Sequence, residues 1–192
     1  ACRQSARMRD IINMVLDLEK MERKSVQLQF LPHPFNKWVE DNMKDFVIEG
    51  KERGIQVVLE ADARIKQVDF DIQKCDIVLN NLLINALKHS PEHTTITVKT
   101  ELDTEHKQAY VRISDEGTGL QAVNQEELFT RFYQGAKEKN GTGLGLAYSK
   151  VLLDQHGGTI GAYNNETKGA TFFFTLPLRQ AAVKEEEAES IL

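Results

Sequence analysis

The order of helix and strand patterns constrains the fold of this chain more than any single residue does. Apolar residues that recur every three or four positions predict helices, and apolar residues that alternate with polar ones predict strands. The predicted helices cover residues 35–53, 71–89, 125–132 and 144–156, and the predicted strands cover residues 26–30, 55–59, 68–70, 95–100, 110–114, 159–163 and 171–176. Because the two kinds of element do not alternate regularly, we expect an α+β fold, a two-layer sandwich in which a mixed, largely antiparallel sheet carries helices on one face.

A separate helix is predicted ahead of this sandwich. Over residues 1–25, apolar side chains such as Ile11, Val15 and Leu18 form a narrow stripe among charged residues. Such a stripe is typical of one helix of a coiled coil or four-helix bundle, and it fits equally well an amphipathic helix packed on its own domain. We therefore expect one long helix at 1–25, a main domain at 26–179, and an acidic linker or tail at 180–192.

Composition and charge exclude several classes of function. The net charge is −5 and no basic block could follow a phosphate backbone, which argues against nucleic-acid partners. The only cysteines, Cys2 and Cys75, are widely separated, so the sequence predicts neither a disulfide framework nor a zinc site and suits a reducing cytosol. No apolar run approaches the length that spans a bilayer, and no secretory signal is visible.

The helix predicted at 71–89 carries a polar face. Asn81, Asn85 and Lys88 are spaced four and three residues apart, so they project from one side of it. An amide oxygen is a hard, neutral ligand that suits Mg²⁺, and a lysine one turn further on can neutralise phosphate charge. The alternative is a solvated polar face without a ligand.

An acidic residue and two glycines follow the strand predicted at 110–114. An ionised Asp115 accepts hydrogen bonds but cannot donate them, so it suits the exocyclic amine of adenine and repels the carbonyl of guanine. Gly117 and Gly119 permit close backbone approaches. Two alternatives are a plain tight turn and a dinucleotide fingerprint, because Gly117, Gly119 and Ala122 match G-x-G-x-x-A; the second is weak, since no βαβ unit surrounds it.

Two further segments bracket a polar loop. Phe129 and Phe132 lie three residues apart at its start, either as core residues or as the anchor of a substrate lid over 134–140. At its end, the glycine-rich run 141–146 leads directly into a helix, where backbone amides and the helix dipole favour an anion. This run is not a Walker loop, because it lacks the Lys-Ser/Thr ending.

In this order and spacing, the segments resemble the ATP-binding catalytic domain of sensor histidine kinases, within the GHKL ATPase superfamily. N-L-L-x-N-A-x-K-x-S resembles the asparagine box, D-x-G-x-G the first glycine box, F-x-x-F the phenylalanine box, and G-T-G-L-G-L the second glycine box. The likeness covers residues 70–177 and implies a Bergerat-type ATP-binding fold. The helix at 1–25 resembles the second helix of the family's dimerisation domain.

The resemblance implies a role for each motif residue. It makes Asn85 the Mg²⁺ ligand, with Asn81 as phosphate or metal support, and it places His89 against the base or ribose; His89 is equally well read as a half-buried filler. Asp115 would bind the adenine amine. The remaining residues implied to contact ATP are Lys88, Gly117, Gly119, Phe129, Arg131, Phe132, Lys137, Gly141, Thr142, Gly143, Leu144 and Gly145.

The function implied is a protein-histidine kinase module that uses ATP and Mg²⁺ in two-component signal transduction. Members of the family phosphorylate a histidine followed by an acidic residue, and none of the five histidines here fits, so we expect the acceptor outside this chain. Expected partners are the phosphoacceptor domain of the intact protein and a response-regulator receiver domain, with a homodimer in the intact protein. The resemblance implies a cytoplasmic domain of a protein anchored in the inner membrane, of hybrid type if a receiver domain follows the acidic end.

Two alternatives of other classes stay open. One is an ATP-driven conformational clamp, which typically carries an acidic general base in the asparagine-box helix; the corresponding position here is Asn81, which argues against efficient hydrolysis. The other is a nucleotide-binding scaffold without catalysis.

Overall fold

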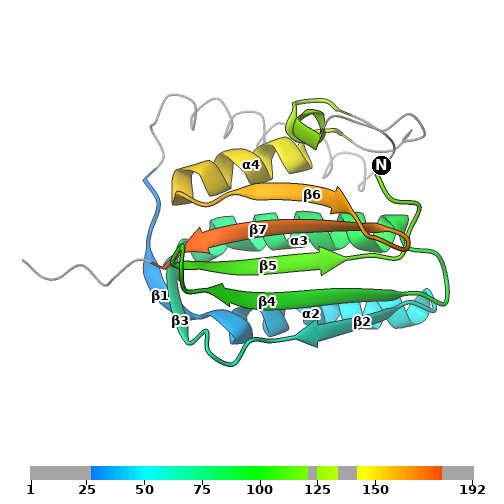
Figure 1. Cartoon of the computed structure of the whole chain (residues 1–192), viewed down its shortest axis with the longest axis horizontal. Helices are drawn as coiled ribbons and strands as arrows, with labels where there is room; N and C mark the ends of the chain where they lie inside the picture. The colour runs from blue at the N-terminus through cyan, green and yellow to red at the C-terminus, as the bar shows by residue number, and fades with distance from the viewer. Residues whose placement is uncertain (1–26, 121–124, 134–141, 179–192) are drawn as a thin grey trace, which may run out of the picture.

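A computed structural model of the chain describes residues 27–120, 125–133 and 142–178 (Figure 1). The described helices are α2 (Phe35–Glu52), α3 (Ile72–His89), the 3-10 helix η1 (Gln125–Phe129) and α4 (Gly145–His156). The described strands are β1 (Leu31–Pro34), β2 (Gln56–Glu60), β3 (Gln67–Phe70), β4 (Thr95–Asp103), β5 (Gln108–Ser114), β6 (Ile160–Asn164) and β7 (Ala170–Pro177). The long helix predicted at 1–25 and the acidic segment at 180–192 lie outside the described residues, so the predicted domain boundaries stay predictions.

The larger sheet has five strands in the order β2-β4-β5-β7-β6 (Figure 1). β2 and β4 are parallel, and the other neighbours are antiparallel. The two long strands β4 and β5 form a hairpin, and β7 lies beside β5 from the Gln108–Pro177 pair to the Ser114–Thr171 pair. The sheet is therefore mixed and largely antiparallel, as the sequence predicts.

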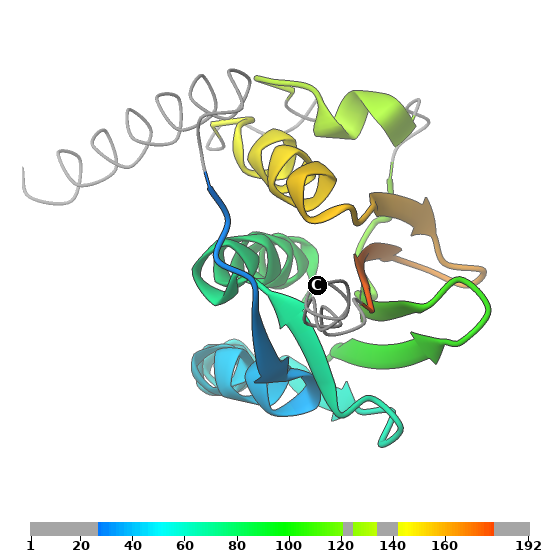
Figure 2. The same ribbon diagram turned by 90° about the vertical axis from the view of Figure 1, so that its left-hand side faces the viewer.

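The helices α2, α3 and α4 form a layer against one face of this sheet (Figure 2). Each helix buries an apolar stripe and leaves a polar face outside, which is the pattern of a helix that packs on a sheet. Asp71 begins α3 by accepting a hydrogen bond from the Lys74 backbone amide at 3.2 Å, and Gly157 ends α4 with a left-handed φ of 74°. The predicted two-layer α+β fold is thus confirmed.

One predicted strand is misplaced. The sequence predicts a strand at 26–30, whereas the structure pairs Leu31–Pro34 with β3 in a separate two-stranded antiparallel sheet. Pro32 and Pro34 both lie within this strand. Two prolines two residues apart turn their missing N–H groups to the same edge, so the other edge remains able to pair in a sheet of only two strands.

Aromatic side chains join the small sheet to the main core. Trp38 of α2 lies 4.8 Å from the Phe70 ring and 6.4 Å from the Phe174 ring, measured between centroids. The indole Nε1 donates to Asp76 Oδ1 at 2.6 Å, so the polar edge of this buried ring is satisfied by α3.

Among the residues that the structure describes, no helix is both long and apolar enough to cross a membrane.

Candidate functional site

Helix α3 packs beside α4 (Figure 2), and its asparagine face contacts the start of α4 through Asn81. Asn81 Nδ2 donates to the Gly145 carbonyl and to Ser149 Oγ, each at 3.1 Å. Because a carbonyl can only accept, the amide orientation of Asn81 is fixed, with both N–H groups toward α4. Asn85, one turn further along, makes no hydrogen bond with the described residues, so its amide oxygen is available to a ligand.

Asp115 follows β5 and is 4% exposed. Its Oδ1 accepts hydrogen bonds from the backbone amides of Gly117 at 2.8 Å and Ala170 at 3.3 Å. No hydrogen bond from the described residues reaches its Oδ2. The carboxylate is therefore oriented by one oxygen and keeps the other as a free acceptor, which is what recognition of an amine requires.

The turn between β6 and β7 contacts the backbone of Asp115. Asn165 Nδ2 donates to the Asp115 carbonyl at 2.8 Å, and the Asn165 backbone amide donates to the Gly169 carbonyl at 3.0 Å. A Cβ on Gly169 would lie 1.9 Å from the Asp115 carbonyl oxygen, and Gly169 has a φ of 84°. Sequence reasoning missed Asn165; its only signal was an asparagine pair between two predicted strands.

The first glycine segment also contacts the end of α3. A Cβ on Gly117 would lie 2.3 Å from the carbonyl oxygen of His89, so only glycine allows this approach. Gly119 has a φ of 72°, and the Leu120 amide beside it donates to Asn164 Oδ1 at 2.5 Å. The His89 and Lys88 side chains are exposed on the last turn of α3. The structure thus brings Asp115, Gly117 and the end of the asparagine helix together.

The second glycine segment meets the aromatic pair. The Phe132 amide donates to the Gly143 carbonyl at 2.8 Å, and a Cβ on Gly143 would lie 2.5 Å from the Phe132 carbonyl carbon. Phe129 is half-buried against the core, whereas Phe132 is 68% exposed and has a φ of 62°. Arg131 between them is exposed. The whole predicted lid at 134–140, with Lys137, and Gly141 at the start of the glycine-rich run lie outside the described residues.

Helix α4 begins without a side-chain cap. Leu144 stands at its N-cap position, and no side chain there accepts from the first-turn amides. Thr142 Oγ1 accepts from the Leu144 amide at 3.3 Å. The Leu144 side chain is buried in the core and only 1% exposed, so only the backbone of Leu144 could face a ligand. Uncapped amides at a helix start, with the positive end of the helix dipole, suit a phosphate.

The sequence model of the histidine kinase-, DNA gyrase B- and HSP90-like ATPases matches residues 70–180, which is more than half of the chain. The chain belongs to this ATPase family. The match covers every predicted motif residue of the ATPase domain from Asn81 to Gly145. It confirms the resemblance read from the sequence, and with it an ATP-binding catalytic domain of the histidine kinase type.

Similar proteins are sensor kinases. Sensor histidine kinase WalK of Bacillus subtilis is 33% identical over 187 residues, covering 92% of this chain and 30% of WalK. Aerobic respiration control sensor protein ArcB of Escherichia coli is 31% identical over 183 residues, covering 92% of this chain and 23% of ArcB. The chain therefore spans less than a third of the length of these relatives.

The fold is also that of solved histidine kinase structures. The catalytic domain of histidine kinase ThkA is 26% identical, with a TM-score of 0.70 over 78% of this chain and 96% of that one. A structure of ThkA in complex with response regulator protein TrrA matches with a TM-score of 0.73 at 23% identity, over 93% of this chain and 49% of that chain.

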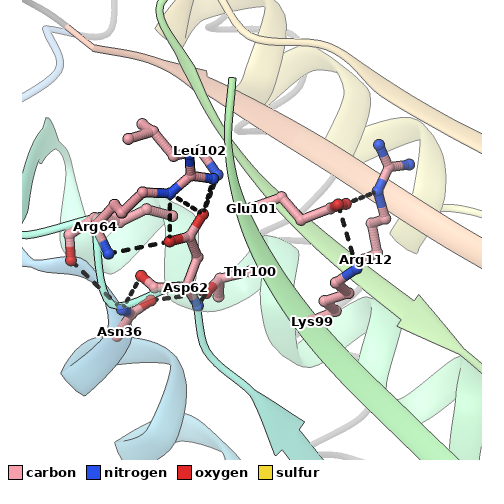
Figure 3. Close-up of polar contacts among 9 residues, drawn as sticks. Asn36, Asp62, Arg64, Lys99, Thr100, Glu101, Leu102 and Arg112 are labelled. Carbon is pink, nitrogen blue, oxygen red and sulfur yellow. Dashed lines mark hydrogen bonds and ion pairs between the residues drawn. The ribbon is translucent and has the colours of Figure 1, made fainter. Parts of the chain in front are cut away.

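A second polar cluster lies away from these motifs, at the β2 side of the sheet (Figure 3). Asp62 accepts from Arg64 and from the Leu102 amide, and these hydrogen bonds, Arg64 first, hold the pKa of Asp62 well below its usual range. The cluster lines a pocket of about 350 Å³. The charges in this cluster are paired: Asp62 with Arg64, and Glu101 with Arg112 and Lys99. We therefore interpret the cluster as structural, connecting the β2–β3 loop to β4.

Proposed function

We propose that this chain binds Mg-ATP and transfers the γ-phosphate to a histidine outside it, as the catalytic domain of a sensor histidine kinase. Oδ2 of Asp115, to which no described residue donates, carries the nucleotide part of the proposal. A carboxylate group that is held by two backbone amides and is only 4% exposed is a strong, fixed acceptor. It would accept a hydrogen bond from the adenine amine. With guanine, it would face a carbonyl oxygen, and two acceptors cannot form a hydrogen bond.

The phosphate part of the proposal rests on α3 and α4. The unbonded Asn85 amide oxygen suits Mg²⁺, which prefers oxygen ligands and keeps several waters. Lys88 on the same helix and the uncapped start of α4 would receive phosphate oxygens. When bound, Mg²⁺ would supply positive charge that offsets the charge of the phosphates. Asn85 holds the ion in this proposal, and the chain's own contribution is position and charge.

The nature of Asn81 favours transfer over hydrolysis. A general base for water needs a carboxylate or imidazole within reach, and Asn81 is a neutral amide whose two N–H groups both point to α4. Phosphoryl transfer depends mainly on positioning and charge stabilisation, so the nucleophile can come from another domain. This favours a kinase over an ATP-driven clamp.

Partners follow from the relatives and remain proposals for this chain. The names of WalK and ArcB describe sensor proteins, and the ThkA complex contains a response regulator. We propose that the protein supplies its phosphoacceptor histidine from a dimerisation domain, acts as a homodimer at the inner membrane, and passes phosphate to a receiver domain.

Calorimetry of the chain with ATP and GTP, each with and without Mg²⁺, tests the nucleotide part. We expect Mg-dependent ATP binding and rejection of GTP. Incubation with labelled ATP and a separately expressed dimerisation domain of a relative such as WalK then tests transfer, with acid-labile label on the acceptor as the expected result. Equal affinity for the two nucleotides would refute the role of Asp115, and ATP binding without any transfer would leave a nucleotide-binding scaffold.

A further inference from the structure

Ser149 is a buried hydroxyl that the sequence motifs do not include. It lies on α4, is 0% exposed, and donates from Oγ to the Gly145 carbonyl at 2.9 Å. Its Oγ also accepts from Asn81 Nδ2 at 3.1 Å. Ser149, Gly145 and Asn81 therefore form a closed triangle of hydrogen bonds between α3 and the first turn of α4.

The direction of every hydrogen bond in this triangle is determined. The Gly145 carbonyl accepts from both side chains, so the single Ser149 proton is committed to it. Asn81 must then present one N–H to the carbonyl and the other to the Ser149 oxygen. Removing the Ser149 hydroxyl would leave one Asn81 N–H without an acceptor in a largely buried place, which is costly.

The triangle joins two parts of the proposed nucleotide site. Asn81 stands one helical turn before Asn85, and Gly145, the last glycine of the glycine-rich run, is the first residue of α4. A displaced α4 would move the backbone amides at its start relative to Asn85. The adenine end around Asp115 is built from β5, β7 and their loops, and within the described part of the chain it shares no hydrogen bond with the triangle.

We propose that Ser149 is a positioning residue for the phosphate end of the site, acting through Asn81 and the Gly145 carbonyl. This inference rests on the proposed function. It predicts that loss of the hydroxyl weakens binding of the triphosphate with its metal and leaves binding of the nucleoside alone unchanged. A residue that only stabilises the fold would weaken both.

Three variants of the full chain separate hydroxyl chemistry from packing. Ser149→Ala removes the hydroxyl and some volume, Ser149→Cys fills the space with a poor hydrogen-bonding group, and Ser149→Thr keeps the hydroxyl. Thr100→Val is the matched control. Thr100 is 1% exposed, and its hydroxyl likewise accepts from one neighbour, the Asp62 amide, and donates to another, Asn36 Oδ1. It lies toward the β2 edge of the sheet, away from α4 (Figure 3).

Calorimetry with adenosine and with Mg-ATP, together with the unfolding temperature, gives the result. We expect Ser149→Ala and Ser149→Cys to weaken Mg-ATP binding about tenfold with adenosine affinity unchanged, and we expect Ser149→Thr and Thr100→Val to keep both affinities. Unchanged Mg-ATP affinity in Ser149→Ala, or an equal loss for both ligands, would overturn the inference alone. Failure of the wild-type chain to bind either ligand would overturn the proposed function as well.

Discussion

The two ends of the candidate nucleotide site are built in different ways. At the adenine end, main-chain groups hold Asp115: the amides of Gly117 and Ala170 bind its carboxylate, and the Gly169 backbone packs against its carbonyl. At the phosphate end, side chains of two helices hold the start of α4 through Asn81 and Ser149. Side-chain contacts can rearrange by rotation about side-chain bonds, whereas backbone contacts move only with the chain. We therefore expect the geometry of the adenine end to be rigid and that of the phosphate end to tolerate small shifts.

The largest effect should come from filling the backbone contact under Asp115. In Gly169→Ala, the new methyl group would lie 1.9 Å from the Asp115 carbonyl oxygen at a φ of 84°. We expect a loss of about 3 kcal/mol or more in the free energy of unfolding, because the backbone on both sides must move. Urea denaturation measures it.

Gly157→Ala is the matched control for that variant. Gly157 has a similar φ of 74°, but its nearest neighbour would be Pro177 Cγ at 3.8 Å, so only the backbone strain of about 1 kcal/mol remains. Equal losses in the two variants would show that the close contact with Asp115 is not what makes the adenine end rigid.

The next effect concerns the acceptor itself. In Asp115→Asn, the amide oxygen can replace Oδ1 between the two backbone amides, which turns Nδ2 toward the ligand in place of the free Oδ2. A donor would then face the adenine amine, so we expect ATP affinity to fall by about 2 kcal/mol, or roughly thirtyfold, and the preference over GTP to shrink. Calorimetry measures both, and Asp103→Asn on the β4–β5 hairpin is the control. An unchanged nucleotide preference would contradict the adenine assignment.

A smaller effect is expected at the phosphate end. Asn85→Ala removes the proposed Mg²⁺ ligand, so ATP affinity should lose its dependence on Mg²⁺, whereas adenosine affinity should stay unchanged. Alanine is the better helix former, so the helix should not lose stability. Asn80→Ala, on the same helix, is the matched control. If ATP binding by Asn85→Ala still depends fully on Mg²⁺, Asn85 is not the Mg²⁺ ligand.

Local signals explain which elements the sequence predicted well. Helix α3 was predicted within one residue, because Asp71 caps it and its apolar residues keep a helical period; both are properties of neighbouring residues. The strand at 31–34 was missed because proline is a poor strand residue in general, whereas here its pairing partner β3 lies on one side only. That partner is 33 or more residues away in the sequence.

The same limit applies to the site. Periodicity places Asn81 and Asn85 on one helix face, but it cannot show that the Asn81 amide is occupied by α4, 64 residues further along the chain. Ser149 reads as one of several polar residues in α4, and Asn165 as a turn residue. Their roles arise only where distant segments meet, so the motifs predict ligand-facing residues and leave the supporting ones unseen.

The last prediction compares the two ends of α4. Its start is held by neutral hydrogen bonds, whereas at its end His156 Nε2 lies 3.6 Å from Cys75 Sγ and accepts from the Asp71 amide at 3.2 Å. Cys75 is fully buried, and burial, followed by the nearby Asp71 and Asp76 carboxylates, raises the pKa of its thiol well above the ordinary value.

The direction of the pH effect follows from that raised pKa. Below about pH 8.5, the thiol is protonated in both states and contributes no pH dependence. Above it, the unfolded chain loses the proton and the folded chain keeps it, so the free energy of unfolding falls by about 1.4 kcal/mol per pH unit until the folded pKa is reached. Urea denaturation at pH 7.5 and 9.5 should therefore show about 1.4 kcal/mol more loss in the wild type than in Cys75→Ala. Equal losses in both proteins would mean that the thiolate is accommodated, and that the end of α4 is as adjustable as its start.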